Sequence, residues 1–210
     1  MKKYELTNEI IECKGKKLYR IKALIDFGNV EKGARGGFIE KEENLSMHDN
    51  AWVYGDAKVC DDAFVSDNAH VCDNAFVYGD AWVRDNAQVS GDARVSGGAR
   101  VSGDAWVCDN AQVSGDAWVS GDAQVSGDAR VYKNVDYAEI NGFGTCCRST
   151  TFFRCQDKTI KVSCGCFLGT IDEFRNQVKN TREGKIAKEY LMIADLMEMH
   201  FCEAEDEYDD

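Results

Sequence analysis

Between Asn50 and Lys133 the chain repeats one hydrophobic pattern every six residues, without insertion or deletion. Each of the fourteen hexads has Ala at its second position and Val at its fourth, as in NAQVSG followed by DARVSG. Alternation of apolar and variable positions is typical of a short β-strand with one buried face. The Gly, Asp and Asn residues between these strands favour tight turns, because they tolerate positive φ at low cost. This fixed period predicts a solenoid.

If three strands make one coil, every third hexad stacks and the residues that follow Ala form three outward columns. The first column would contain Trp52, His70, Gln88, Trp106 and Gln124, the second Lys58, Phe76, Arg94, Gln112 and Arg130, and the third Phe64, Trp82, Arg100 and Trp118. In the third column the Arg100 guanidinium could stack between two indoles. Exposed Trp side chains in a row favour an interface with a partner or a second copy. We therefore expect the interface residues to be Phe64, Trp82, Arg100, Trp118, Trp52 and Trp106. The alternative is that ladders of like residues only stabilise the stack.

The hexads resemble those of left-handed parallel β-helices, in which a small residue follows an aliphatic one four positions later, as in VSGGA at residues 95–99. This resemblance implies a left-handed crossover and a triangular cross-section. Fourteen hexads would make about 4.7 coils, and the prism would be about 22 Å tall at the usual strand spacing. The expected fold class is therefore mainly β, with a left-handed parallel β-helix over residues 50–139.

The segments on either side of the repeat are expected to cover the open ends of the solenoid. Residues 1–49 predict an N-terminal cap with two or three short strands and a turn at Gly36–Gly37. Residues 134–150 would close the other end or lead away from it.

Residues 140–202 predict a small α+β module of ββαα type. TTFFRC and TIKVSCGCFL alternate as two strands around the turn QDK. Thr170 and Glu173 form a capping box for a first helix. The apolar stripe of a second helix would consist of Ile186, Tyr190, Ile193, Leu196 and Met197. Residues 203–210 form an acidic tail.

Composition and charge indicate where the protein is located and which partners are excluded. No apolar run is long enough for a membrane span, and the N-terminus has no stretch typical of a signal peptide, so we expect a cytoplasmic location. Ten cysteines are then expected to be reduced thiols. The formal net charge is −12, of which −7 lies in residues 50–133 and −6 in residues 134–210. An acidic body argues against nucleic acid as a partner, and no membrane partner is expected.

The whole layout resembles prophage-encoded hexapeptide-repeat proteins of bacteria, which are often labelled acyltransferases. The resemblance rests on GGFIEKEENLS in the cap, the DA-x-V-x-G hexads, and CGCFLGTIDEF followed by AKEYL. Enzymes of the hexapeptide class bind acyl-coenzyme A or an acyl-carrier protein in a groove between subunits and use a histidine as general base. His70 is the only histidine within the hexads, and His48 and His200 lie outside them. The resemblance therefore implies His70 as the candidate base, although no hexad carries an inserted loop that would shape an acceptor pocket.

Two functions follow as hypotheses. The favoured one is a non-catalytic binding or scaffold protein of phage or prophage origin in a bacterial host, needing no cofactor. It would form a homo-oligomer, with a trimer favoured, and would interfere with a host process or capture a ligand between subunits. The alternative is an acyltransferase that uses acetyl-coenzyme A at a groove between subunits, with His70 or His48 as base. A zinc site could be imagined from a group of cysteines together with His200, namely Cys146, Cys147, Cys155, Cys164 and Cys166. No metal is expected, and Cys164 and Cys166 are only weak candidates, because the spacings CC and C-x-C are not the usual C-x2-C pair and reduced Cys is also a small core residue.

Overall fold

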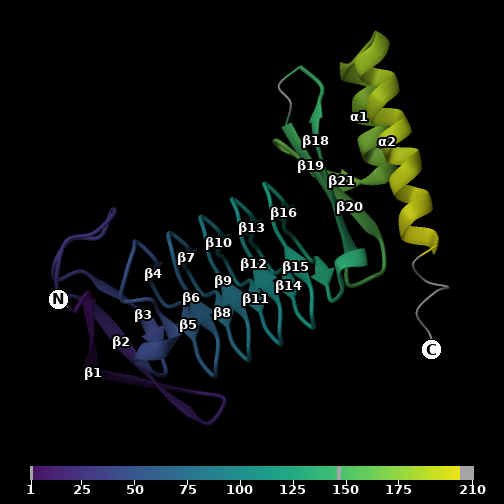
Figure 1. Cartoon of the computed structure of the whole chain (residues 1–210). Coiled ribbons are helices and arrows are strands. Elements are labelled where there is room, and N and C mark those ends of the chain that lie inside the picture. Colours follow the sequence, from purple (N-terminus) through teal and green to yellow (C-terminus); the bar gives the residue numbers. More distant parts are fainter. Residues whose placement is uncertain (1, 146–147, 204–210) are drawn as a thin grey trace.

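The computed structural model describes residues 2–145 and 148–203, and its body is a parallel β-solenoid with a different structure at each end (Figure 1). Fourteen two-residue strands build the solenoid, one from each hexad. They are β4 (Trp52–Val53), β5 (Lys58–Val59), β6 (Phe64–Val65), β7 (His70–Val71), β8 (Phe76–Val77), β9 (Trp82–Val83), β10 (Gln88–Val89), β11 (Arg94–Val95), β12 (Arg100–Val101), β13 (Trp106–Val107), β14 (Gln112–Val113), β15 (Trp118–Val119), β16 (Gln124–Val125) and β17 (Arg130–Val131). The prediction of a mainly β fold with a parallel solenoid is confirmed.

The strands stack in three parallel sheets, and the register joins every residue to the one eighteen positions later. Gln88 pairs with Trp106, Arg94 with Gln112, and Arg100 with Trp118. All three predicted columns are therefore present, on three separate faces. The Ala and Val side chains of the hexads fill the interior and are essentially inaccessible to solvent. Because the hydrophobic contribution scales with buried apolar area, this continuous column of small aliphatic side chains supplies most of the stabilisation of the solenoid.

The corners between strands carry the positive φ angles that the hexad pattern requires. Gly takes this conformation at eight hexad corners, and Asp takes it at five others, namely Asp61, Asp67, Asp73, Asp85 and Asp109. A positive φ is energetically unfavourable for an L-residue with a side chain, and Asp is one of the residues for which this cost is smallest. The corner residues are thus turn formers, as the sequence predicts.

The N-terminal cap consists of β1 (Tyr4–Cys13), β2 (Lys16–Ala23) and β3 (Arg35–Ile39), followed by a short 3-10 helix (Glu42–Asn44). β1 and β2 form a long antiparallel hairpin, and β3 joins the cap to the solenoid by pairing in parallel with β5. The expected turn at Gly36–Gly37 is wrong, because both residues lie inside β3. Their small size serves close packing instead: a Cβ atom at Gly37 would lie 2.6 Å from the carbonyl oxygen of Ala57.

The two ends of the solenoid present opposite backbone groups, and each end is covered by matching side chains. Carbonyl oxygens are left over at the first coil, where Asn44 Nδ2 donates to the carbonyl of Ala63 and Lys3 Nζ donates to that of Ala51. N–H groups are left over at the last coil. There the side chains of Asn134, Glu139 and Thr151 accept from the N–H groups of Trp118, Asp122 and Gln124, respectively. Unpaired buried backbone groups are costly, so these contacts fix where the stack ends.

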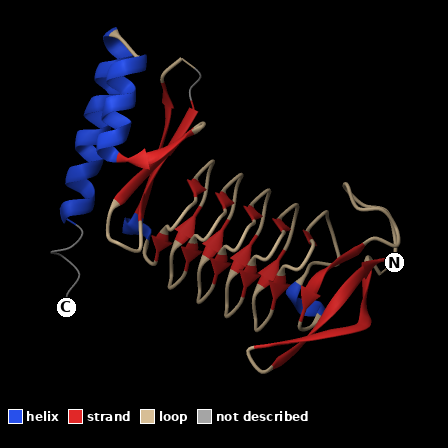
Figure 2. Ribbon diagram, turned by 180° about the vertical axis from the view of Figure 1, so that it is seen from behind, coloured by secondary structure: helices blue, strands red, loops and turns tan. Residues whose placement is uncertain are grey.

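The C-terminal module is a four-stranded antiparallel sheet with two helices packed along it, at the opposite end from the cap (Figures 1 and 2). Its elements are β18 (Tyr137–Phe143), β19 (Arg148–Arg154), β20 (Ile160–Cys164), β21 (Phe167–Thr170), α1 (Ile171–Thr181) and α2 (Gly184–Glu203). Phe153 and Cys155 extend the solenoid core into the module, so the module also closes the open end.

The expectation of two strands in this module is corrected to four. Gly165, with φ of 61°, makes a turn that divides TIKVSCGCFL into β20 and β21. Residues 137–143, for which no strand is predicted, form β18 by pairing with β19. The capping box at Thr170 is confirmed, since Glu173 N–H donates to its hydroxyl at 3.2 Å. On α2 the core side chains include Tyr190, Ile193 and Met197, whereas Leu196 is exposed.

Candidate functional site

Four residues of the third column, Phe64, Trp82, Arg100 and Trp118, lie one coil apart on a single sheet of the solenoid, and we call them the aromatic face. Trp82 and Trp118 are 48% and 43% exposed, and Arg100 between them is also exposed. The rings of Phe64 and Trp82 meet edge to face with centroids 6.2 Å apart. Trp118 Nε1 donates to Ser102 Oγ at 2.9 Å, which fixes the indole against the sheet. Large apolar side chains held open to solvent in a row are typical of an interaction surface.

The Arg100 guanidinium does not stack on either indole in the part of the chain that the structure describes. Its donors also make no ion pair with a described carboxylate. The aromatic face therefore offers two indoles with a cation between them that no described carboxylate pairs with, a combination that suits planar or anionic groups on a partner.

Trp106 occupies the equivalent hexad position on a different face. It is 43% exposed, and its Nε1 donates to Ser90 Oγ at 2.9 Å. The indole lines a groove of about 360 Å³ between the solenoid and the turn that joins β20 to β21. Gln124, Ser163 and Leu168 lie on the other walls of this groove. Trp106 thus faces the C-terminal module and is separate from the aromatic face.

Trp52 is not on the surface, which corrects the expectation that it forms part of a binding surface. Its side chain is 1% exposed and packs edge to face against Tyr4 and Phe27 of the cap, with ring centroids 6.0 and 5.3 Å away. The hexad pattern places Trp52 outward like the other Trp residues, but the cap covers the first coil. Trp52 is a core residue of the junction between cap and solenoid.

The three histidines lie on different elements of the fold. His70 is half-buried on β7 and meets Tyr54 edge to face at 5.2 Å. Burial lowers its pKa below the usual 6.5, so the imidazole is neutral at pH 7. His48 is exposed in the loop before the first hexad, and His200 lies near the end of α2 beside Phe201. None of the three has a carboxylate partner among the described residues that would orient it as a base.

Cys164 and Cys166 sit at the two ends of the turn between β20 and β21. Thr150 Oγ1 donates to Cys164 Sγ at 3.2 Å, and Cys166 is exposed. Among the described residues, neither belongs to a group of three side chains close enough to hold a metal ion. Cys146 and Cys147 lie outside the described residues.

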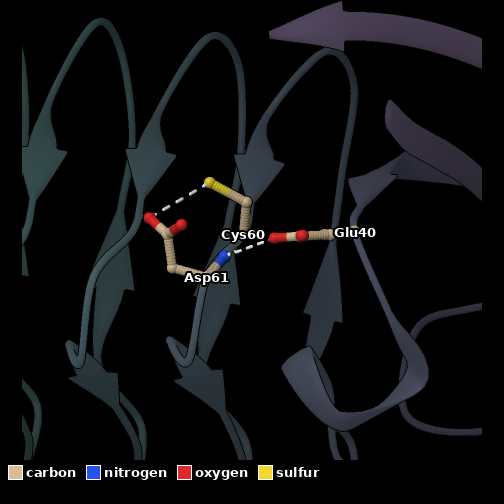
Figure 3. Close-up of side chains that lie close together, drawn as sticks. All are labelled: Glu40, Cys60 and Asp61. Atoms are coloured by element: carbon tan, nitrogen blue, oxygen red, sulfur yellow. Dashed lines mark hydrogen bonds between the residues drawn. The ribbon is translucent and has the colours of Figure 1, made fainter. Parts of the chain in front are cut away.

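One cluster that the sequence did not predict brings Glu40, Cys60 and Asp61 together at the cap end of the solenoid (Figure 3). The Asp61 N–H donates to Glu40 Oε2 at 2.7 Å, and the Cys60 thiol lies 3.6 Å from Asp61 Oδ2. The Lys16 ammonium from β2 forms ion pairs with both carboxylates.

These contacts set the charges of the cluster. Lys16 holds the pKa of Asp61 below its usual range, while burial raises the pKa of Cys60 to about 12. The lysine therefore already supplies the positive charge that a metal ion would bring, and the thiol stays protonated. The sequence could not show this cluster, because Lys16 and Glu40 are positioned by strand pairing within the cap.

Comparison with known proteins adds one match. Residues 87–103 and 123–135 match the family described as the YdcK β-solenoid repeat. No curated protein matches the chain. No helix of the described residues has the length and apolar character to cross a membrane. The matched segments lie within the stacked hexads, and the protein is a repeat β-solenoid protein whose repeats are similar to those of the YdcK β-solenoid.

Proposed function

We propose that this protein is a non-catalytic scaffold that assembles with further copies of itself through the aromatic face. The observation that carries this proposal is the exposure of Trp82 and Trp118 on one sheet, with the exposed Arg100 between them. Burying two half-exposed indoles removes a large apolar area from water. A three-fold axis parallel to the solenoid would bring three copies of such a column together, and we therefore expect a trimer.

The rest of the molecule supports a structural role. The solenoid is a continuous rod closed by a cap at one end and by a module at the other, so it holds the two at a fixed separation. The resemblance to prophage-encoded hexapeptide-repeat proteins is the ground for placing this scaffold in the cytoplasm of a bacterium. There it would bind a host component or capture a ligand between subunits.

Mass determination in solution tests the assembly. Size-exclusion chromatography with light scattering should give three times the chain mass of 23.4 kDa. Trp82→Ala combined with Trp118→Ala should give the monomer mass. Trp106→Ala is the matched control, because this indole has the same hexad position and a similar exposure on another face. Wild-type protein that stays monomeric at 100 times the assay concentration would overturn the proposal.

The alternative is acyl transfer from acetyl-coenzyme A with His70 as base. The observation in its favour is that burial keeps the His70 imidazole neutral and able to accept a proton at pH 7. Native mass spectrometry with added acetyl-coenzyme A tests it directly. A mass increase equal to the cofactor, together with loss of acyl transfer in His70→Gln, would favour the enzyme. Absence of the mass increase would rule this alternative out.

A further inference from the structure

Another groove runs along the second column of the solenoid, on a face separate from the aromatic face. It has a volume of about 610 Å³ and follows β5, β8, β11, β14 and β17 from Lys58 to Arg130. Cys13 and Lys14 from the β1–β2 hairpin line it near one end, and Gln156 lines it near the other. Five stacked strands span about 19 Å at the usual spacing. The groove is therefore bounded by the cap and the module, which limits the length of any ligand.

Four cations line this groove, namely Lys14, Lys58, Arg94 and Arg130. None of them makes an ion pair with a carboxylate of the described residues. Other cations of the cap and module do pair, as Arg20 does with Glu9 and Arg175 with Asp195. In a chain of net charge −12, these four cations form a local concentration of positive charge that no carboxylate of the described residues neutralises through an ion pair.

Arg130 has a spare donor at the end of the groove. Its Nη2 donates to Gln156 Oε1 at 2.9 Å, whereas Nη1 is buried and has no hydrogen-bond partner among the described residues. A buried unsatisfied donor is costly, and the cost is larger when the group is charged. An anion seated beside Arg130 would remove this cost.

The cations are spaced along the groove. Lys58, Arg94 and Arg130 alternate with the neutral residues Phe76 and Gln112, so they lie two coils apart, at about 10 Å. Lys14 lies in the gap between Lys58 and Arg94, with its ammonium 4.9 Å from the centroid of the Phe76 ring. The positive charge thus extends along most of the groove rather than being concentrated at one point.

Two carboxylates on the corners, Asp92 and Asp128, partly offset these cations. They share the rim with Asn74 and Asn110, and Asn74 Nδ2 donates to Asp92 Oδ1 at 3.1 Å. The remaining positive charge is local, and the acidic surroundings disfavour a long polyanion that would extend past the ends. A short ligand with several negative charges fits both the volume and the charge.

We propose that this groove binds a short polyphosphate chain, either inorganic polyphosphate or the phosphate chain of a nucleotide. Successive phosphates place negative charges along a compact linear ligand. Guanidinium groups pair with phosphate oxygens through two parallel hydrogen bonds, which suits Arg94 and Arg130. This site is independent of the aromatic face and of the assembly proposed above.

Calorimetric titration of the full chain with tripolyphosphate at low salt tests the proposal. Wild-type protein should bind one tripolyphosphate per chain. Arg94→Ala and Lys58→Ala should each weaken binding about tenfold, equivalent to about 1.4 kcal/mol. Arg84→Ala is the matched control, since it removes a solenoid cation that does not line the groove, and it should leave the affinity unchanged.

A gain of affinity provides a second test. Asp92→Asn should tighten binding several-fold, because it removes a negative charge from the rim. The replacement is compatible with the fold, since Asn50, Asn68 and Asn86 already form such a ladder on another corner. The absence of tripolyphosphate binding to wild type would overturn the proposal. So would equal weakening by Arg84→Ala and Arg94→Ala. Tighter binding of ATP than of tripolyphosphate would assign the groove to a nucleotide, and equal or weaker binding would assign it to inorganic polyphosphate.

Discussion

The Asp73 carboxylate accepts a hydrogen bond from the backbone N–H of Gly91, 3.0 Å away and one coil later in the stack. Asp61 does the same for Gly79, and Asp109 for Gly127. At each of these corners the Asp side chain holds the next coil in register, while the Gly above it takes a positive φ without strain. The corner residues therefore act between coils as well as within their own turn.

Replacing the upper glycine of such a pair should destabilise the solenoid. Gly91 has φ of 66°, and a Cβ atom there would lie 2.9 Å from the backbone nitrogen of Asp109. We expect Gly91→Ala to cost about 2–3 kcal/mol, from backbone strain and the displaced neighbouring coil together. Urea denaturation followed by circular dichroism measures the loss.

The control is Gly15→Ala in the β1–β2 hairpin, where φ is 77° and a Cβ atom meets nothing within 4 Å. This variant should lose about 1 kcal/mol of folding stability, from the strained backbone conformation alone. Equal losses in the two variants would show that the spacing between coils plays no part.

The corners and columns are also the part of the fold that the sequence predicts best. The hexad period determines which residues stack, because each strand and corner has the same length in every repeat. Exposure does not follow from the period in the same way. Trp52 and Trp106 have the same hexad position, yet only Trp52 is covered, by Tyr4 and Phe27 of the cap. Trp106 stays half-exposed. Contacts from outside the repeat decide this difference.

The stability of the protein should depend on pH through His70. Its pKa in the folded state is lowered by burial, so the unfolded chain takes up a proton more readily. The contribution of His70 to stability is therefore complete above pH 6.5 and is lost as the pH falls below that value. His70→Gln should flatten the stability profile between pH 6.5 and 5, and thermal denaturation at several pH values measures it. An unchanged profile in this variant would contradict the assignment.

Removing Lys16 should convert its cluster into a metal site. Lys16→Met leaves the carboxylates of Glu40 and Asp61 beside the Cys60 sulfur without a counter-charge. We expect a lower Tm that added Zn²⁺ restores, with Zn²⁺ binding at least tenfold tighter than to wild type. Lys17→Met, on the neighbouring exposed position of β2, should change neither. Equal binding of Zn²⁺ to wild type and Lys16→Met would refute this prediction.

Cys60 should resist alkylation in the native protein. It is buried, and its pKa is raised to about 12, so very little thiolate exists at pH 8. Iodoacetamide at pH 8 should label the exposed Cys166 at least a hundred times faster than Cys60, as followed by peptide mass spectrometry. In urea the two rates should converge. Fast labelling of Cys60 in the folded state would mean that the cluster opens.

The C-terminal module shows where the sequence pattern is insufficient. Strand β18 contains Glu139, Asn141 and Gly142, which interrupt its apolar pattern, and it becomes a strand because β19 provides hydrogen-bond partners. Its Glu139 also accepts from the last coil, so its position depends on the end of the solenoid. The groove along the second column also depends on contacts between distant segments, since Lys14 and Gln156 reach it from the cap and from the module. Neither feature has a period that a local pattern could reveal.

The eighteen-residue register makes the length of the rod adjustable in whole coils. Excision of one coil, for example residues 86–103, would bring the module about 5 Å nearer to the cap and leave its orientation unchanged. Excision of a single hexad would instead advance the remaining strands by one sheet, so that a column from one face would continue onto the next. The same module would then stand over a different side of the prism. Removal of hexads in threes thus changes only the distance between the two ends, whereas removal of a single hexad changes the direction as well.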